Sequence, residues 1–223
     1  MFLCNKMKKE TYPGGLFMGK NFVITIARGF GSGGKEIAHT VAKKLGVKCY
    51  EHSILTLASH LSGVDRSLFA EADEKLLKPS FIHTIKETLS PHPESHFVSN
   101  DELFSYEAQI IKGLAASESC VIVGKAADFV LRDFENVFSF YIEAPRDFCL
   151  KNVMSKMDVT EDEANKLITE TDKYRAEFYK YITGGNYWTN PVNYDLTLNT
   201  KKVGKEKAVR VICDYVNMMM EGK

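Results

Sequence analysis

The sequence predicts an α/β fold in which a parallel β-sheet is covered by helices on both faces. Two observations lead to this prediction. Short apolar runs that are rich in β-branched residues recur along the chain, and such runs are typical of strands buried on both sides. Longer segments with apolar residues at helical spacing separate these runs, as expected for the crossover connections between parallel strands.

Five segments have the composition of strands. Residues 22–27, with the sequence FVITIA, form the first apolar run. The run CVIV at residues 120–123 and the run VFSFYI at residues 137–142 are similar. Residues 47–50 are a candidate for a short second strand, and residues 194–199 alternate apolar and polar side chains as a further strand would.

Three of the intervening helices have clear boundaries or faces. The first has an apolar stripe between residues 37 and 45 and is expected to end at Gly46. The sequence TEDE at residues 160–163 is a capping box, which predicts that a long helix begins there. The last helix is predicted from about residue 203, and its core-facing stripe consists of Val209, Ile212, Cys213, Val216 and Met220.

The length of 223 residues suits one domain with an inserted lobe. Residues 1–20 lack the apolar core of a signal peptide and are interpreted as an N-terminal extension, and residues 21–223 are interpreted as the domain. From about residue 60 to residue 99 there are no strand signals, and four of the six histidines gather there. We interpret this stretch as an inserted helical acceptor or lid lobe. Its loop histidines His92 and His96 have no partners at metal-ligand spacing, so the sequence predicts no protein metal site.

The composition excludes several classes of protein. Hydrophobic residues make up 44% and charged residues 26%, which is an ordinary globular balance rather than that of a disordered chain. The 29 basic and 29 acidic residues cancel, which disfavours binding of nucleic acid through bulk charge. The five scattered cysteines include no CxxC pair, as expected for a cytoplasmic protein. No apolar run approaches the ~20 residues that span a bilayer, so no membrane partner is predicted.

The segment GFGSGGK at residues 29–35 matches the GxxxxGK part of a phosphate-binding loop. Its glycines let backbone amides approach an anion, and the helix that follows points its positive end at the same place. Lys35 would lie against the β- and γ-phosphates, whereas Arg28 either contacts phosphate or caps the strand. The expected phosphate-binding residues are Arg28, Gly29, Gly31, Ser32, Gly33, Gly34, Lys35 and Glu36.

Glu36 departs from the usual loop, in which a serine or threonine hydroxyl at this position holds Mg²⁺. An acidic side chain near a helix N-terminus is locally favourable. Close to a triphosphate the same charge is repulsive unless a metal ion intervenes. Either the metal is held mostly by water and phosphate, or the site prefers a ligand other than Mg-ATP.

These segments resemble the cytidylate kinase-like family of P-loop kinases from about Asn21 onward. The resemblance rests on residues 24–50, on VIVGKAADFVL at 121–131, on FYIEAP at 140–145, on DKYR at 172–175 and on WTNPVNYDLTLNT at 188–200. It implies a three-layer P-loop kinase fold with a five-stranded parallel sheet and a helical acceptor lobe. It also implies ATP and Mg²⁺ as cofactors, nucleotides as the binding partners, and phosphoryl transfer to CMP or dCMP.

Several positions depart from the family pattern. Glu51 stands where an aspartate is usual, and Lys125 stands where an arginine is usual. Cys149 and Asn152 occupy two positions of expected lid arginines. Arg146 and Lys151 lie nearby and are candidates to replace them, and Lys125 and Glu51 follow strand ends and are candidates to face the acceptor. Lysine keeps the charge of arginine but loses its two-pronged donation to phosphate.

Arg175 falls on the apolar stripe of the helix after Thr160. A cation on such a face needs an anionic partner, and Asp172, three residues earlier, is at the right spacing. The two side chains form either a purely structural pair or a phosphate-binding arginine oriented by Asp172, and the resemblance favours the second interpretation. With Lys35, they are the predicted catalytic residues.

The sequence therefore leads to three hypotheses. The first is a kinase that transfers the γ-phosphoryl group of ATP to a nucleoside monophosphate. The second keeps the donor site but uses another small acceptor. The third is a nucleotide-binding regulatory protein with weak catalysis, which the residues Glu36, Cys149 and Asn152 favour.

Overall fold

The computed structural model describes residues 21–67 and 100–221, and it has the predicted α/β fold. The predicted extension, residues 1–20, and most of the predicted lobe, including His92 and His96, lie outside the described residues. Five parallel strands form one sheet in the order β2-β3-β1-β4-β5. The strands are β1 Val23–Arg28, β2 Lys48–Tyr50, β3 Cys120–Val123, β4 Val137–Glu143 and β5 Leu196–Asn199.

Helices connect these strands in the order that the sequence predicts. They are α1 Gly34–Leu45, α2 Ser53–Ser62, α5 Asn100–Ser117, α6 Ala127–Val130, α7 Arg146–Met157, α8 Glu161–Ile182, α9 Thr200–Val203 and α10 Lys205–Met220. A short 3₁₀ helix at Pro191–Asn193 precedes β5.

The predicted helix boundaries are largely confirmed. Gly46 ends α1 in a left-handed conformation, and the capping box of Thr160 and Glu163 begins α8. The last helix, α10, begins at Lys205, close to the predicted start, and Gly204, with φ 78° and ψ 151°, separates it from the short helix α9. The last strand begins two residues later than predicted, at Leu196, because Tyr194 ends the 3₁₀ turn and its hydroxyl donates to the carbonyl of Trp188.

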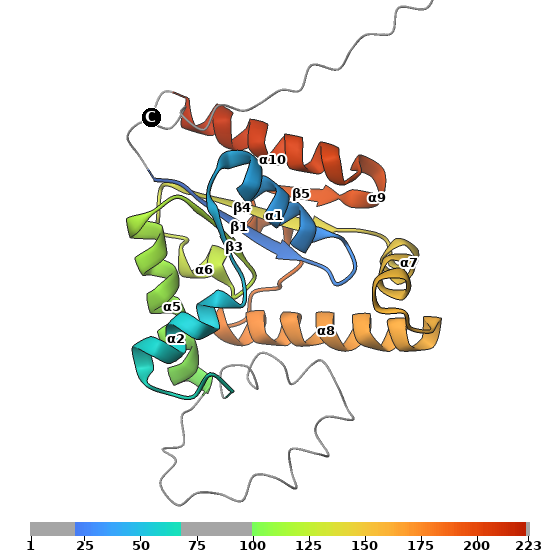
Figure 1. The fold of residues 1–223 in the computed structure, drawn as a ribbon, viewed down its shortest axis with the longest axis horizontal. Coiled ribbons are helices and arrows are strands. Elements are labelled where there is room, and N and C mark those ends of the chain that lie inside the picture. The colour runs from blue at the N-terminus through green and yellow to red at the C-terminus, as the bar shows by residue number, and fades with distance from the viewer. Residues whose placement is uncertain (1–20, 68–99, 222–223) are drawn as a thin grey trace, which may run out of the picture.

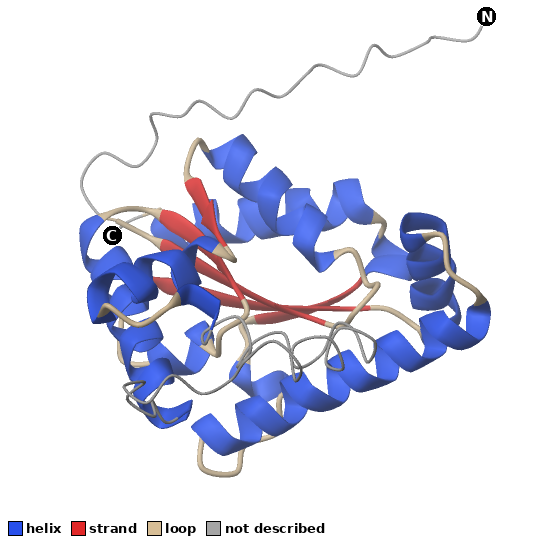
Figure 2. Ribbon diagram, turned by 60° about the horizontal axis from the view of Figure 1, so that its bottom comes forward, coloured by secondary structure: helices blue, strands red, loops and turns tan. Residues whose placement is uncertain are grey.

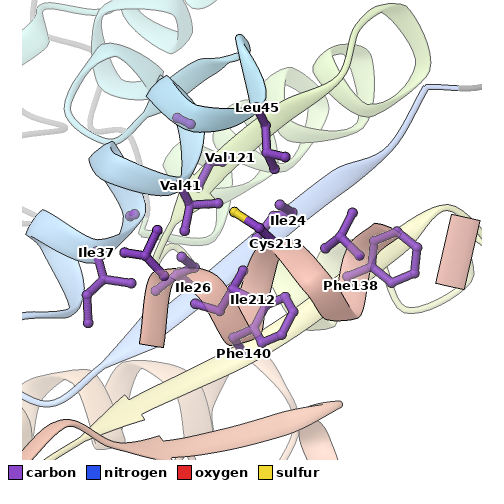
Figure 3. Packing of buried hydrophobic residues seen from close by; sticks show 14 of the residues in the cluster. Ile24, Ile26, Ile37, Val41, Leu45, Val121, Phe138, Phe140, Ile212 and Cys213 are labelled. Atoms are coloured by element: carbon purple, nitrogen blue, oxygen red, sulfur yellow. The ribbon is translucent and has the colours of Figure 1, made fainter. Parts of the chain in front are cut away.

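The sheet is the middle of three layers (Figures 1 and 2). On one face, Ile24 and Ile26 of β1 pack with Phe140 of β4 against α1 and α10 (Figure 3). On the other face, Val23 and Ile122 pack against α2, α5 and α6. Side chains alternate between the two faces of a strand, so both faces of β1 are buried and its sequence is a continuous apolar run.

The carboxyl end of the central strand β1 leads directly into the phosphate loop. The neighbouring strands β3 and β4 end beside it, since all five strands run in one direction. Open parallel sheets bind ligands at this edge. In the part of the chain that the structure describes, no helix has both the length and the apolar character needed to cross a membrane.

Ile212→Ala is expected to lower the free energy of unfolding by about 2–5 kcal/mol, because it leaves a cavity between α10 and the sheet. Ile212 is 0% exposed, whereas its neighbour Val211 is 37% exposed. Val211→Ala removes a similar side chain from the same helix and should change the stability by less than about 0.5 kcal/mol. Urea unfolding of both variants checks the difference, and equal losses would contradict this packing.

Candidate active site

The phosphate loop is shaped by glycines that no other residue could replace easily. Gly31 has φ 81° and Gly33 has φ 86°, both in the left-handed region. A Cβ atom on Gly31 would lie 2.8 Å from the carbonyl oxygen of Cys149, and one on Gly34 would lie 2.5 Å from Cβ of Arg28. The loop therefore holds its curvature only with small residues at these points.

Three amides of the loop are available for an anion. In the described structure, the N–H groups of Gly33 and Lys35 donate no hydrogen bond, and that of Glu36 contacts only its own carboxylate. Ser32 is fully buried, and its hydroxyl donates to the carbonyl of Gly29 at 2.8 Å, so it shapes the loop as a structural residue. The free amides lie at the N-terminus of α1, where phosphate oxygens bind readily. The residues present therefore fit the phosphates of a nucleotide.

A pocket of about 330 Å³ extends from this loop between α7, α8 and the ends of β1 and β3. Its lining includes all of the predicted phosphate-binding residues except Ser32, and three further predicted site residues. The predicted residues that line it are Arg28, Gly29, Gly31, Gly33, Gly34, Lys35, Glu36, Glu51, Lys125 and Arg175.

Lys35 lies in an ion pair at the floor of the pocket. Its Nζ atom is 2.8 Å from Oε2 of Glu51, and Nη2 of Arg28 is 3.5 Å from the other carboxylate oxygen. Burial alone would raise the pKa of Glu51, but the hydrogen bond from Lys35 and the charge of Arg28 lower it overall. Glu51 is therefore ionised at neutral pH. It forms ion pairs with the two cations that a phosphate group would otherwise contact.

Asp172 and Arg175 form the predicted pair and bind the phosphate loop. Oδ1 of Asp172 accepts hydrogen bonds from Nη1 of Arg175 at 3.2 Å and from the backbone N–H of Phe30 at 2.9 Å. Nη1 of Arg175 also donates to the carbonyl of Arg28 at 2.9 Å. Burial raises the pKa of Asp172, and burial together with the charge of Arg28 lowers the pKa of Arg175 to about 9. The pair thus has a structural role, while Arg175 also lines the pocket.

Lys125 lies in a strained turn after β3. Lys125 and Ala126 have φ values of 61° and 49°, and consecutive left-handed residues other than glycine are uncommon. Nζ of Lys125 is 3.1 Å from Glu107 of α5, and each side chain of this pair is 8% exposed. The pair fixes the turn that forms one wall of the pocket.

The two candidates for replacing the lid arginines lie outside the pocket lining. The guanidinium of Arg146 donates to Asn165 and Thr169 of α8, and it therefore joins two helices. Lys151 points away from the face of α7 that meets the pocket, because residues 152, 153, 156 and 157 form that face. The expectation that these two residues replace the lid arginines in binding substrate thus has no support from their positions.

Cys149 and Asn152, at the positions where lid arginines are expected, make structural contacts instead. The side chain of Cys149 is buried among apolar residues of α7 and α8. Asn152 donates from Nδ2 to the carbonyl of Gly31 at 2.8 Å. Both residues therefore hold α7 against the phosphate loop.

Two charged pocket residues escaped the sequence analysis. Lys156 forms an ion pair with Glu36, and its position one helical turn after Asn152 was the available signal. Asp128 of α6 accepts a hydrogen bond from the hydroxyl of Tyr179 at 2.6 Å. Burial raises the pKa of Asp128 to about 6, although the hydroxyl of Tyr179 opposes this shift. Nothing local in the sequence indicated that this carboxyl group is buried.

Aromatic side chains of α8 line the same pocket as Asp128. Tyr174 and Phe178 stack with ring centroids 6.0 Å apart and an interplanar angle of 17°, and both line the pocket. Trp188 also lines the pocket but is only 7% exposed, and it packs edge-on against Tyr141. This half of the pocket is thus flat-walled and apolar, with one carboxyl group.

Within the described residues, no three histidine, cysteine, aspartate or glutamate side chains come together as a metal site. Glu36 and Glu51 are two carboxylates that line the pocket beside the loop. Mg²⁺ commonly binds proteins through one or two carboxylates and takes its other ligands from phosphate and water. These residues therefore fit a magnesium ion that is carried by a nucleotide.

The sheet order, the loop and the pocket beside it define the P-loop kinase fold. The chain belongs to the cytidylate kinase-like family, whose model matches residues 23–202. The comparison with curated proteins gives no match.

Solved structures share this fold. An uncharacterized protein from Eubacterium ventriosum is similar, with 22% identity and a TM-score of 0.66, over 88% of this chain and 99% of that one. A shikimate kinase from Acinetobacter baumannii has 12% identity and a TM-score of 0.50, over 95% of this chain and 100% of its own. A shikimate kinase from Bacteroides thetaiotaomicron has 13% identity and a TM-score of 0.50, over 87% and 98%.

Asp128→Asn is expected to raise the free energy of unfolding at pH 7. The pKa of Asp128 is raised from 3.8 to about 6 in the folded protein, so ionisation of this group costs stability as the pH rises through that interval. The shift limits the gain of the variant at neutral pH to about 3 kcal/mol.

Urea unfolding of the two proteins between about pH 4 and pH 8 measures this difference. The gain of the Asp128→Asn protein over the wild type should grow between pH 4 and pH 6 and then level off. A difference that is independent of pH would contradict the assignment of the buried proton to Asp128.

Proposed function

We propose that this protein transfers the γ-phosphoryl group of ATP to a nucleoside monophosphate, with CMP or dCMP as the expected acceptor. The observation that carries the proposal is the single pocket that joins two unlike halves. One half is the phosphate loop with its free amides and Lys35. The other is the flat aromatic wall around Asp128.

The donor half suits the β- and γ-phosphates of ATP. The amides of Gly33, Lys35 and Glu36 would bind phosphate oxygens, and the ammonium group of Lys35 would leave Glu51 to contact them. Bound magnesium would neutralise charge on the phosphates. Lys35 is 51% exposed, so its side chain can move from the carboxylate to a ligand.

Phosphoryl transfer depends mainly on position and on neutralising charge in the transition state. Arg175 is well placed for this role beside the loop, because the hydrogen bonds to Asp172 and to the carbonyl of Arg28 hold its guanidinium in one orientation. Asp172 would then act as a positioning residue. No general base is required in this scheme. Glu51 would contact either the acceptor or Lys35, its partner in the structure.

The acceptor half suits a planar base. Tyr174 and Phe178 present stacked aromatic side chains, and Asp128 provides the polar group that a base needs for recognition. The choice of CMP or dCMP follows from the family to which the chain belongs. Lys125 would stabilise this wall through its pair with Glu107 and face the acceptor from the strand end.

Another small acceptor is the second candidate, and the loss of lid arginines at Cys149 and Asn152 favours it. A nucleotide-binding protein without turnover is the third, and the ion pair between Lys35 and Glu51 favours that function. The similar shikimate kinases act on a different acceptor class according to their names. The three functions predict different results in one assay of ADP release.

Coupled ADP release with Mg-ATP separates these functions when CMP, dCMP, UMP, AMP, GMP and shikimate are tested in parallel. Turnover with CMP or dCMP alone supports the first function. Turnover with UMP, AMP or GMP keeps the first function with another nucleotide acceptor, and turnover with shikimate supports the second. ATP binding without turnover for any of them contradicts the proposed kinase and supports the third function or the second with an acceptor outside this panel.

Lys35→Ala is expected to lower turnover by about 100-fold or more, because it removes a cation that contacts the phosphates in the transition state. Lys43→Ala is the matched control, since Lys43 lies on the exposed side of the same helix and outside the pocket. It should keep full activity. Steady-state kcat/KM of both variants tests this, with circular dichroism as the check on folding, and normal turnover of folded Lys35→Ala would contradict the assignment.

A further inference from the structure

Glu36 and Lys156 form an ion pair at the rim of the donor half of the pocket. Glu36 is the third residue of α1, and Lys156 lies in the last turn of α7, 120 residues away in sequence. Both side chains line the pocket, and they are 44% and 46% exposed. The pair therefore connects the phosphate loop to α7 at the place where a nucleotide phosphate would enter.

The charge of Glu36 is a difficulty for any phosphate ligand. Burial would raise the pKa of Glu36, but the hydrogen bonds from Lys156 and from its own backbone, together with the charges of Lys156 and Lys205, lower the pKa overall. The ionised carboxylate follows Lys35 directly and lies beside the free amides of the loop. It would repel a triphosphate unless a cation lay between them. In P-loop proteins the hydroxyl at this position holds Mg²⁺, and carboxylate oxygen is a ligand that Mg²⁺ accepts.

Lys156 has a matching position on α7. Cys149 is buried and Asn152 binds the carbonyl of Gly31, so neither supplies charge to the pocket. Arg146 and Lys151 lie outside the lining. In the described part of the chain, Lys156 is thus the cation that α7 brings to the pocket. An exposed ion pair is weak, so its partners can be exchanged for stronger ones.

We propose that the Glu36–Lys156 pair exchanges partners when a metal–nucleotide complex binds. Glu36 becomes a ligand of the divalent cation that the β- and γ-phosphates carry, and Lys156 donates to a phosphate oxygen. The proposal rests on the donor half of the proposed function and is independent of the acceptor. It makes Glu36 the metal-binding group that replaces the usual hydroxyl.

Calorimetric titration with ATP, in excess Mg²⁺ and separately in EDTA, tests the exchange. The wild-type protein should bind ATP more tightly with Mg²⁺. In Glu36→Gln, the gain in ATP affinity that Mg²⁺ gives should be about tenfold smaller than in the wild type. The same variant should bind metal-free ATP at least as well as the wild type does, because a repulsive charge is removed. Lys156→Met should weaken ATP binding by a similar factor in both conditions and leave the effect of Mg²⁺ unchanged.

A purely structural pair predicts a different pattern. Glu36→Gln and Lys156→Met would then break the same contact, change ATP binding equally and leave its dependence on Mg²⁺ as in the wild type. The charge-swapped double variant, Glu36→Lys with Lys156→Glu, would restore binding if the pair only joined α1 to α7. Under the proposed exchange the swap restores neither the metal dependence nor the affinity. Either structural result overturns the proposal.

Lys166→Met is the matched control for the lysine change. Lys166 lies on the surface of α8, pairs with Glu170 and lies outside the pocket, so ATP binding should be unchanged. Thermal unfolding confirms that each variant is folded. A protein that shows the predicted metal dependence but no turnover would overturn the kinase function alone. A wild-type protein that binds ATP in neither condition would overturn both.

Discussion

Two side chains of helix α8 hold the phosphate loop by hydrogen bonds to its backbone on either side of Gly29. Arg175 donates to the carbonyl before the loop, at Arg28, and Asp172 accepts from the N–H group of Phe30 within it. The same helix carries Tyr174 and Phe178 of the aromatic wall, so both halves of the pocket are held by one element. Because both charges are largely desolvated, removal of either partner would leave the other without compensation, which costs several kcal/mol. The loop therefore depends on this pair for its position as well as its shape.

The pocket is basic, yet its cations are already engaged with carboxylates. Lys35 and Arg28 meet Glu51, and Lys125 meets Glu107. A ligand with several negative charges must therefore compete with groups of the protein. This competition lowers the affinity for single anions and favours polyphosphates, which can replace several carboxylates at once. A site of this kind needs cations only near the ligand, so it is compatible with the formal net charge of zero of the whole chain.

The sequence predicted the sheet and the loop well because their signals are local. Both faces of β1 are buried, so its apolar run and the glycines after it are visible without any knowledge of the fold. The spacing of Asp172 and Arg175 on one helix indicated their pair for the same reason. Partners distant in sequence were missed. Arg146 lies against Asn165, and Lys156 lies against Glu36, and only the packing of α7 decides which of these cations reaches the pocket.

The departures from the family pattern on α7 have one physical consequence. The helix packs directly on the phosphate loop. Asn152 donates to the carbonyl of Gly31, and a Cβ atom on Gly31 would lie only 2.8 Å from the carbonyl oxygen of Cys149. A helix in such close contact has little room for long guanidinium groups at these two positions. It contributes one cation from its last turn, and that cation already compensates the acidic residue of the loop. Glutamate in the loop and lysine on α7 thus belong together, because Lys156 compensates the charge of Glu36, which would otherwise repel phosphates.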